Sequence, residues 1–211
     1  HLPIQDRTET EFDVLIDFTT PSGSEHWLEY CLTCERAIVI GTTGHSDEQL
    51  ATIRKAGRKI PIVKASNMSL GVNVLFSLVG RIAEVLGDGY DIEIVESHHR
   101  FKNDAPSGTA LGLLDAIVEA TGRDKNNDVV FGRHGATGPR PARQIGVHAL
   151  RLGDTVGEHE VHFGNLGETI VIRHSAHTRD TFAQGSLRAA EWIAGRKPGL
   201  YTMQDVLGLT K

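Results

Sequence analysis

Three short apolar runs, separated by helical stretches, dominate the first third of the chain. Residues 14–18, 37–40 and 60–63 are rich in Val and Ile, as buried parallel strands are. Residues 24–34 fit a helix, and so does the stretch from Ser46 to about residue 59. Ser46 and Gln49 match a capping box at its start. This alternation with short connections predicts a doubly wound, Rossmann-like α/β fold.

The middle of the chain has a different pattern, which predicts an inserted α+β domain with a mixed sheet. A helix over 70–86 and another ending near 121 flank an alternating strand over 91–96. The loop-rich stretch 124–151 follows, and the last helix is expected over 181–194. Three close strand candidates favour the mixed sheet: 145–150, 158–163 and 169–174. The predicted divisions are a partial dinucleotide-binding domain (1–68), a substrate-binding and oligomerisation domain (69–178) and a returning C-terminal segment (179–211).

Composition excludes several classes of protein. With 39% hydrophobic and 23% charged residues, the 211-residue chain is predicted to be globular rather than disordered. A net charge of −5 argues against nucleic-acid and anionic-membrane partners. No apolar run is expected to reach the roughly 20 residues of a membrane helix, and no leader argues for export. Cys31 and Cys34 lie near a helix end, which favours small apolar residues over a redox pair.

The densest group of chemically capable residues lies between residues 96 and 110, after a predicted strand and before a helix. Ser107, Gly108 and Thr109 fall at the predicted helix N-terminus, where free N–H groups and the helix dipole bind anions. His98 and Lys102 can move protons or hold a second anion. A ligand with two negative groups is therefore expected. The alternative for each residue is an ordinary loop histidine or helix cap.

Two further loops follow predicted parallel strands, where ligands bind in doubly wound folds. They predict a nucleotide or dinucleotide site. The first loop, residues 41–44, fits an ordinary tight turn equally well. The predicted cofactor residues are Gly41, Thr42, Thr43, Ala65, Ser66, Asn67 and Met68.

Metal binding is the weakest of the candidate chemistries. His159, Glu160 and His162 lie close together, but in a strand His159 and His162 face opposite sides. His174 and His177 form the other histidine pair, and no H-E-x-x-H motif or thiolate set appears. No metal site is predicted, and a histidine-based metallohydrolase is kept only as an alternative.

The stretch Glu96-Ser97-His98-His99-Arg100-Phe101-Lys102-Asn103-Asp104-Ala105-Pro106-Ser107-Gly108-Thr109-Ala110 resembles the signature of the dihydrodipicolinate reductase family, E-x-H-H-x-x-K-x-D-A-P-S-G-T-A. The supporting stretches begin at Ile16, Ile40, Asn67, Asp154 and Phe182, so the resemblance covers essentially the whole chain.

The resemblance implies a reductase of lysine and diaminopimelate biosynthesis that uses NADH or NADPH and acts on a small cyclic dicarboxylate. It implies proton transfer by His98 and Lys102, and substrate contacts from His99, Ser107, Gly108 and Thr109. Gly41, Thr42 and Thr43 and residues 65–68 match cofactor contacts. It also implies a cytoplasmic homotetramer built through the middle domain.

One departure from the family pattern concerns the start of the chain. The family's phosphate-binding loop, G-x-x-G-R-M-G, does not occur, and His1-Leu2-Pro3 reads as a cut end. The chain enters the pattern roughly sixty residues late, judged by two missing βα units. Weak cofactor affinity is therefore expected, and the choice between NADH and NADPH cannot be read. The alternative is a non-catalytic, dicarboxylate-binding oligomerisation module.

Overall fold

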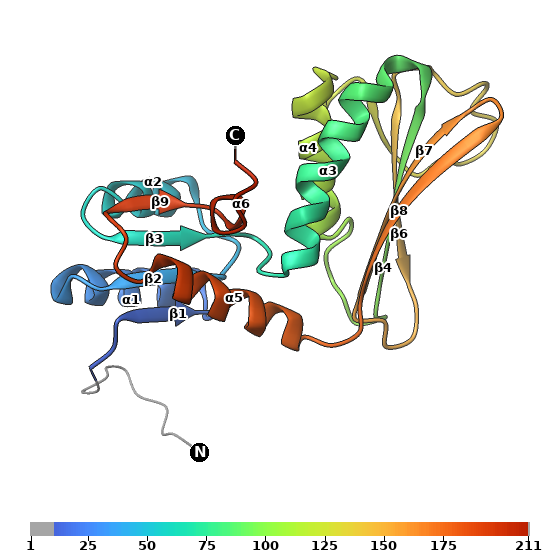
Figure 1. The fold of residues 1–211 in the computed structure, drawn as a ribbon. Helices are drawn as coiled ribbons and strands as arrows, with labels where there is room; N and C mark the ends of the chain where they lie inside the picture. The colour runs from blue at the N-terminus through green and yellow to red at the C-terminus, as the bar shows by residue number, and fades with distance from the viewer. Residues whose placement is uncertain (1–10, 211) are drawn as a thin grey trace. The chain divides into compact units, whose positions relative to one another are not determined.

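The computed structural model describes residues 11–210, which form two compact units (Figure 1). Unit 1 contains residues 11–66 together with 184–210, and unit 2 contains 67–183. Each unit has its own sheet and its own hydrophobic core.

Unit 1 is built on a parallel four-stranded sheet in the order β1-β2-β3-β9. The strands are β1 (Val14–Asp17), β2 (Ala37–Ile40), β3 (Pro61–Lys64) and β9 (Gly199–Tyr201). Every residue of β2 is buried, as expected for a central parallel strand covered on both faces. The predicted α/β class is confirmed.

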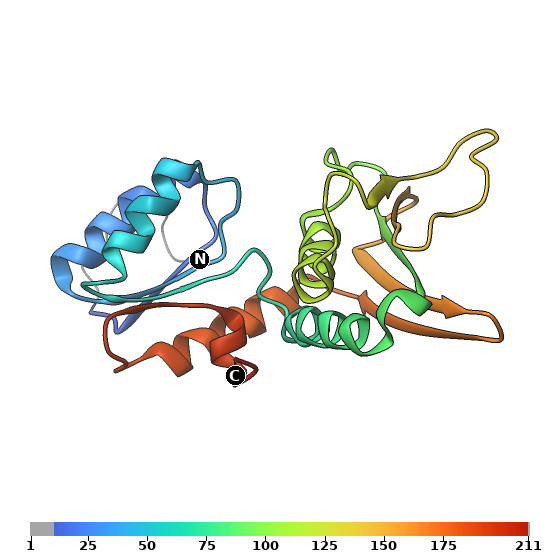
Figure 2. The ribbon, with the colours of Figure 1, turned by 90° about the horizontal axis from the view of Figure 1, so that it is seen from above.

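Helices cover both faces of this parallel sheet. Figure 2 shows α1 (Pro21–Cys34) and α2 (Asp47–Ala56) on one face and α5 (Asp180–Ile193) on the other. The Ser46–Gln49 capping box is present and starts α2, as predicted. The core between the sheet and α1 and α2 contains Leu28, Cys31, Ile38, Ile40, Ile53, Ala56, Ile60 and Ile62.

Unit 2 contains a mixed five-stranded sheet in the order β5-β6-β4-β7-β8, which confirms the predicted sheet type. Its strands are β4 (Asp91–His98), β5 (Val129–Phe131), β6 (Ile145–Arg151), β7 (Gly157–Asn165) and β8 (Glu168–Ala176). The central strand β4 runs parallel to β6 and antiparallel to β7.

Two helices, α3 (Leu70–Leu86) and α4 (Gly108–Thr121), pack on one face of the mixed sheet. The short 3₁₀ helix η1 (Gly87–Gly89) follows α3. The core contains Leu75, Val79, Ala83, Ile92, Ile94, Ala110, Leu113, Leu114, Ile117, Ile145, Val147, Val161 and Phe163. This helix-covered side of the sheet is called the inner face, and the opposite side the outer face.

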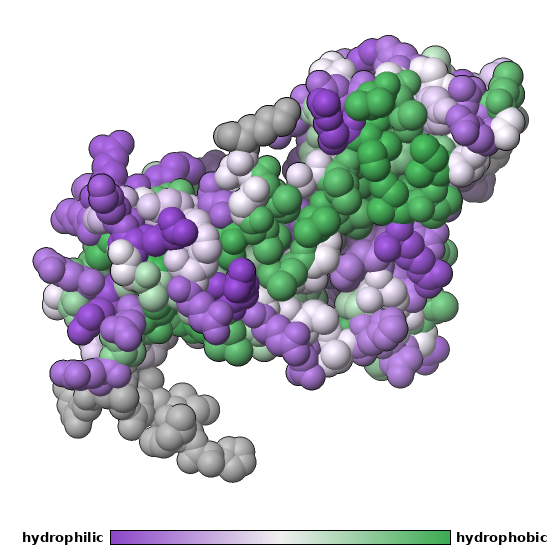
Figure 3. All heavy atoms as spheres, viewed as in Figure 1, coloured by the Kyte–Doolittle hydropathy of each residue, from purple (hydrophilic) through white to green (hydrophobic). Residues whose placement is uncertain are grey.

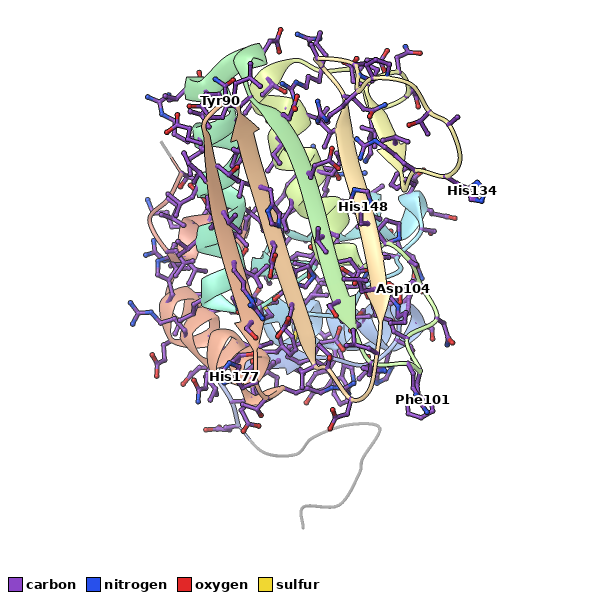
Figure 4. All side chains as sticks on the ribbon, turned by 90° about the vertical axis from the view of Figure 1, so that its right-hand side faces the viewer. Tyr90, Phe101, Asp104, His134, His148 and His177 are labelled. Carbon is purple, nitrogen blue, oxygen red and sulfur yellow. The ribbon has the colours of Figure 1, made fainter. Side chains whose placement is uncertain are left out.

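The outer face of the mixed sheet carries paired charges, and Figure 4 views it with His148 labelled. Glu93 of β4 accepts hydrogen bonds from Arg133, Arg140 and His148. Burial alone would raise the pKa of Glu93, but these three donors lower it to about 2. The loop between β5 and β6 is thus tied to the sheet by its arginines.

Helix α3 corrects one expectation from the sequence. Residues Leu70–Gly89 are long and apolar enough to cross a membrane by length and composition, although no run of that kind was expected. Core helices pass the same test, and α3 buries Leu75, Val79 and Ala83 in the core of unit 2. Its other side exposes an apolar strip that is visible in Figure 3 and includes Leu70, Val74, Leu78 and Val85.

Candidate active site

The candidate site begins on the inner face of β4. Alternation along this strand places Ile92, Ile94, Glu96 and His98 on the same side. The first two belong to the hydrophobic core, whereas Glu96 and His98 are buried polar residues at the end of the strand. Buried polar groups are retained when they have partners, so their contacts define the site.

Strand register brings two residues from distant parts of the sequence beside this pair. Arg151 of β6 lies opposite His98, and His159 of β7 lies opposite Glu96. The Arg151 guanidinium donates to both carboxylate oxygens of Glu96, at 2.8 and 2.9 Å. A bidentate pair of this kind fixes both position and charge.

Glu96 accepts two further hydrogen bonds. The Nδ1 atom of His98 lies 2.6 Å from Glu96 Oε2, and the Ser107 N–H donates to Oε1 at 3.1 Å. Burial alone would raise the pKa of Glu96, but bonds from Arg151, His98 and Ser107 hold it below its usual value. Glu96 is therefore an ionised carboxylate at neutral pH.

His98 is subject to opposing electrostatic influences. Burial lowers the pKa of its imidazole, Glu96 raises it, and the positive charges of Lys102 and Arg151 lower it. The net direction is downward, so a large neutral fraction exists near neutral pH. A group that holds and releases a proton in that range suits acid–base catalysis.

Ser107 is the N-cap of α4, so the helix starts where the sequence predicted, and the helix-cap alternative describes the contact that Ser107 makes. Its hydroxyl accepts from the Ala110 N–H, and it lies 3.0 Å from His159 Nε2. The N–H groups of Gly108 and Thr109, in the first turn, have no carbonyl four residues earlier in the helix. A Cβ built on Gly108 would contact nothing within 4 Å, so the space beside this turn is open. The helix start can therefore accept an anion.

His159 takes part in this arrangement through its contact with Ser107. Burial and the neighbouring His98 lower its pKa to about 4, so it is neutral at pH 7. His162 lies on the outer face and bonds Glu160 instead, so the two histidines face opposite sides as predicted. Within residues 11–210, no group of three His, Cys, Asp or Glu side chains could hold a metal ion.

Lys102 and His99 lie in the loop after β4. The Lys102 ammonium donates to Asp104 at 2.8 Å and is about one-fifth exposed. The ring of His99 lies 6.3 Å from that of Phe101, and its Nδ1 is buried without a partner in the described part of the chain. Figure 4 shows Phe101 and Asp104 in this loop at one end of the sheet.

In unit 1, the predicted cofactor loop after β2 is organised by a buried carboxylate. Asp17, at the end of β1, accepts hydrogen bonds from Thr19, from Ser24 in α1 and from Thr42 at 3.0 Å. Gly41 leaves room for a neighbouring ring, because a Cβ there would lie 2.3 Å from Phe18. Thr43 is exposed, so this edge offers backbone, a hydroxyl and a half-exposed aromatic ring.

The second predicted cofactor segment, residues 65–68, follows β3 and crosses the division between the units. The Ala65 N–H bonds the Ile40 carbonyl, and Ser66 is the last residue of the first part of unit 1. Asn67 donates to Thr109 at 2.9 Å, within unit 2. The side chain of Met68 is buried, which leaves its backbone as the group available to a ligand.

The sequence did not assign roles to four residues that organise these sites. In the sequence, Glu96 stands out only as part of the family motif and His159 only as a candidate metal ligand, whereas nothing marks Arg151 or Asp17 as functional. Period-two alternation from His98 would have indicated Glu96. Arg151 and His159 are placed by strand register, which one sequence does not give.

The fold and the site define an α/β enzyme with a nucleotide-binding type of parallel sheet and a buried acid–base cluster. Residues 3–68 match the family model described as the N-terminus of dihydrodipicolinate reductase, and residues 71–207 match that of its C-terminus. The chain therefore belongs to the dihydrodipicolinate reductase family, whose members are NAD(P)H-dependent oxidoreductases.

Individual relatives agree with this assignment. The chain is 52% identical to the 4-hydroxy-tetrahydrodipicolinate reductase of Hahella chejuensis, over 94% of this chain and 74% of that protein. It is 53% identical to the reductase of Thiobacillus denitrificans, over 93% and 73%. Among solved structures it resembles dipicolinate-bound dihydrodipicolinate reductase from Paenisporosarcina sp. TG-14. That match has a TM-score of 0.70 and 28% identity, and covers 92% of this chain and 72% of the other.

Proposed function

We propose that this chain reduces 4-hydroxy-tetrahydrodipicolinate to tetrahydrodipicolinate with NADH or NADPH, the 4-hydroxyl group leaving as water, as a step of lysine and diaminopimelate biosynthesis. The observation that carries the proposal is the position of His98. Its imidazole is hydrogen-bonded to an ionised Glu96, which also accepts from the N-cap of α4. This arrangement suits proton transfer beside a bound anion.

A cyclic dicarboxylate fits the groups around His98. The open first turn of α4, at Gly108 and Thr109, suits one carboxylate, and the Lys102 ammonium suits the other. The relative from Paenisporosarcina was solved with dipicolinate, itself a planar dicarboxylate. We assign Ser107 to cap the helix that binds the substrate, and His99 to contact the substrate through its unpartnered Nδ1.

The residues at the carboxyl edge of the parallel sheet fit a nicotinamide cofactor. Gly41 removes the side chain that would collide with the Phe18 ring, and Asp17 holds the neighbouring Thr42 in place. Ligands of doubly wound sheets bind at this edge. Gly41, Thr42, Thr43, Ala65, Ser66, Asn67 and Met68 would hold the cofactor, which supplies a hydride when bound.

The chain's own residues must deliver the proton that accompanies the hydride. His98 would hold it at Nε2, because Nδ1 is engaged by Glu96. Lys102 would donate a proton to the substrate or stabilise negative charge on it. Its ammonium has three N–H donors, and only one of them bonds Asp104 in the described structure.

Substitution of the two proton-transfer residues tests the proposal. His98→Ala and Lys102→Ala are each expected to lower kcat by about 10²–10⁴-fold, because general acid–base groups contribute that much. The measurement is NADPH or NADH oxidation with enzymatically generated substrate. His162→Ala, on the outer face, and Lys125→Ala, beside Asp115, are the matched controls.

Two results would contradict the proposal. One is near-normal turnover in both His98→Ala and Lys102→Ala with circular dichroism unchanged. The other is dipicolinate binding by the unaltered chain without any reduction, which would favour the non-catalytic dicarboxylate-binding module.

We also propose that the protein is a cytoplasmic homotetramer. The outer face of the mixed sheet exposes Leu150 and Val171. Apolar side chains on an uncovered sheet face are typical of a surface that contacts another chain. Association of chains through this face would build the assembly, and the biosynthetic role supports the location.

A further inference from the structure

The carboxylate of Glu96 does more than fill a buried position, because its hydrogen bonds determine which nitrogen of His98 is protonated. The Glu96 side chain has no exposed surface and is held ionised chiefly by Arg151. An ionised carboxylate can only accept hydrogen bonds. The 2.6 Å contact with His98 Nδ1 therefore requires the proton to be on Nδ1.

That tautomer leaves Nε2 as the nitrogen with a free lone pair. Nε2 lies beside Gly157, where a built Cβ would be only 3.1 Å away, so the absence of a side chain keeps the space next to it open. Neutral His98 therefore takes up a proton at Nε2 and gives it back from Nε2. Each transfer returns His98 to the same Nδ1–H form.

Arg151 has the opposite electrostatic effect on His98. Its Nη1 donates to Oε2 of Glu96, the same oxygen that His98 contacts, and its Nη2 donates to Oε1. Glu96 without Arg151 would stabilise the imidazolium and make proton release less favourable. The Arg151 guanidinium offsets the negative charge of Glu96. It still leaves Oε2 of Glu96 able to accept the hydrogen bond from His98 Nδ1.

We infer that Glu96 and Arg151 are positioning residues that jointly set the tautomer and the proton affinity of His98. The inference rests on the proposed function for its catalytic meaning. The other charged or titratable groups near His98 are Lys102, whose partner is Asp104, and His159, whose ring lies 5.2 Å from that of His98. Neither bonds Nδ1, so the tautomer depends on Glu96.

The test is a nitrogen-15 NMR titration of the full chain, with the His98 signals assigned by their loss in His98→Asn. In the unaltered protein, Nδ1 is expected to be the protonated nitrogen of the neutral form. In Glu96→Gln the midpoint of the His98 titration is expected to fall by about one pH unit, because a negative charge is removed. In Arg151→Met it is expected to rise by a similar amount, because the remaining carboxylate is no longer offset.

Matched controls use the outer face. Glu160 bonds His162 two residues along β7, as Glu96 bonds His98 along β4, so Glu160→Gln is expected to leave the His98 titration unchanged. Arg173→Met, on β8, removes an arginine paired with Glu158 and Glu160 and is expected to do the same. Both controls report any general effect of losing an ion pair.

Opposite shifts of the His98 titration midpoint in Glu96→Gln and Arg151→Met distinguish this role from loss of structure. Loss of structure would move the midpoint in the same direction in both variants. Shifts of the same sign, or a neutral form protonated on Nε2, would overturn the inference. The tautomer measurement on the unaltered chain needs no substitution, so it stands even if a variant fails to fold. Turnover is measured separately: normal titration results without reduction would refute the proposed function and leave this inference intact.

Discussion

Two glutamates on β4 show how one residue type serves different purposes at different depths. Glu93 faces outward and Glu96 inward, and each is bound by arginine. Glu93 is bonded on the outer face by Arg133, Arg140 and His148, and its pKa is lowered to about 2 against the effect of burial. Glu96 shares one oxygen between Arg151 and His98. Its charge is therefore coupled to a group that can exchange protons with a ligand.

Gly157→Ala is predicted to damage catalysis much more than stability. The new Cβ would lie 3.1 Å from His98 Nε2, and the ring cannot turn away without losing its bond to Glu96. A displacement of the reacting nitrogen is expected to lower kcat by about tenfold or more, since small misplacements of catalytic groups are costly. Steady-state kinetics and urea unfolding of the variant provide the measurements.

The matched control for this prediction is Gly164→Ala on the same strand. A Cβ there would lie 3.7 Å from the Thr169 hydroxyl, an ordinary contact. Its kcat is expected to be unchanged. Equal losses of activity in both variants would show that Gly157 matters to the strand rather than to His98.

The sequence predicted the local part of the site but not its supporting contacts. Ser107, Gly108 and Thr109 were placed at a helix start by their residue types, and the structure has Ser107 as the N-cap of α4. Arg151 and His159 reach the site through pairing with β4. Such pairing depends on strand order and register, which a single sequence does not reveal.

At the level of elements, the sequence predicts a helix or strand correctly where its apolar periodicity is strong and its ends are clearly marked. Residues 70–86 were predicted as a helix with the bounds that α3 has, because apolar spacing and Gly87 define its end. The three-residue strands β5 and β9 and the four-residue helix α6 (Met203–Val206) were missed. Elements this short carry too few residues to show a period, and tertiary pairing stabilises them.

The packing of α3 against α4 depends on a small residue. A Cβ on Gly80 would lie 2.9 Å from the Ala116 carbonyl oxygen, and backbone cannot move aside easily. Gly80→Ala is therefore predicted to lower the free energy of unfolding by about 1–3 kcal/mol through overpacking. Chemical denaturation followed by circular dichroism measures the change.

Gly112→Ala, on the facing helix, is the comparison. Its Cβ would meet the Phe76 ring at 2.9 Å, and a side chain can rotate. The loss of stability is expected to be smaller than in Gly80→Ala, with the gain in helix propensity offsetting part of it. An equal or larger loss of stability in Gly112→Ala would contradict the idea that contact with backbone determines how much stability is lost.

At the level of the whole molecule, the two hydrophobic cores are made from different residues. The core of unit 1 includes Ile38 and Ile62, and that of unit 2 includes Ile94 and Leu114. The candidate proton-transfer residues belong to unit 2, and the loop with Gly41 belongs to unit 1. Under the proposed function, the proton-transfer residues and the loop with Gly41 would thus be supported by separate cores.

The proposed homotetramer gives a prediction at this scale. Val171→Lys places a charge on the outer face of β8, where the valine is 48% exposed, so the fold of one chain should tolerate it. The mass measured by light scattering is expected to fall below that of four chains. Leu166→Lys, at the fully exposed turn between β7 and β8, serves as the control and should leave the mass unchanged. A single-chain mass for the unaltered protein would refute the assembly.

The alternation along β4 has a consequence for folding errors. Ile92 and Ile94 lie on the same face as Glu96 and His98. A slip of one residue in the pairing of β4 would turn all four to the other side at once. Such a molecule would lose its core and its proton-transfer group together. Correct pairing of β4 therefore secures the hydrophobic core and the position of His98 together.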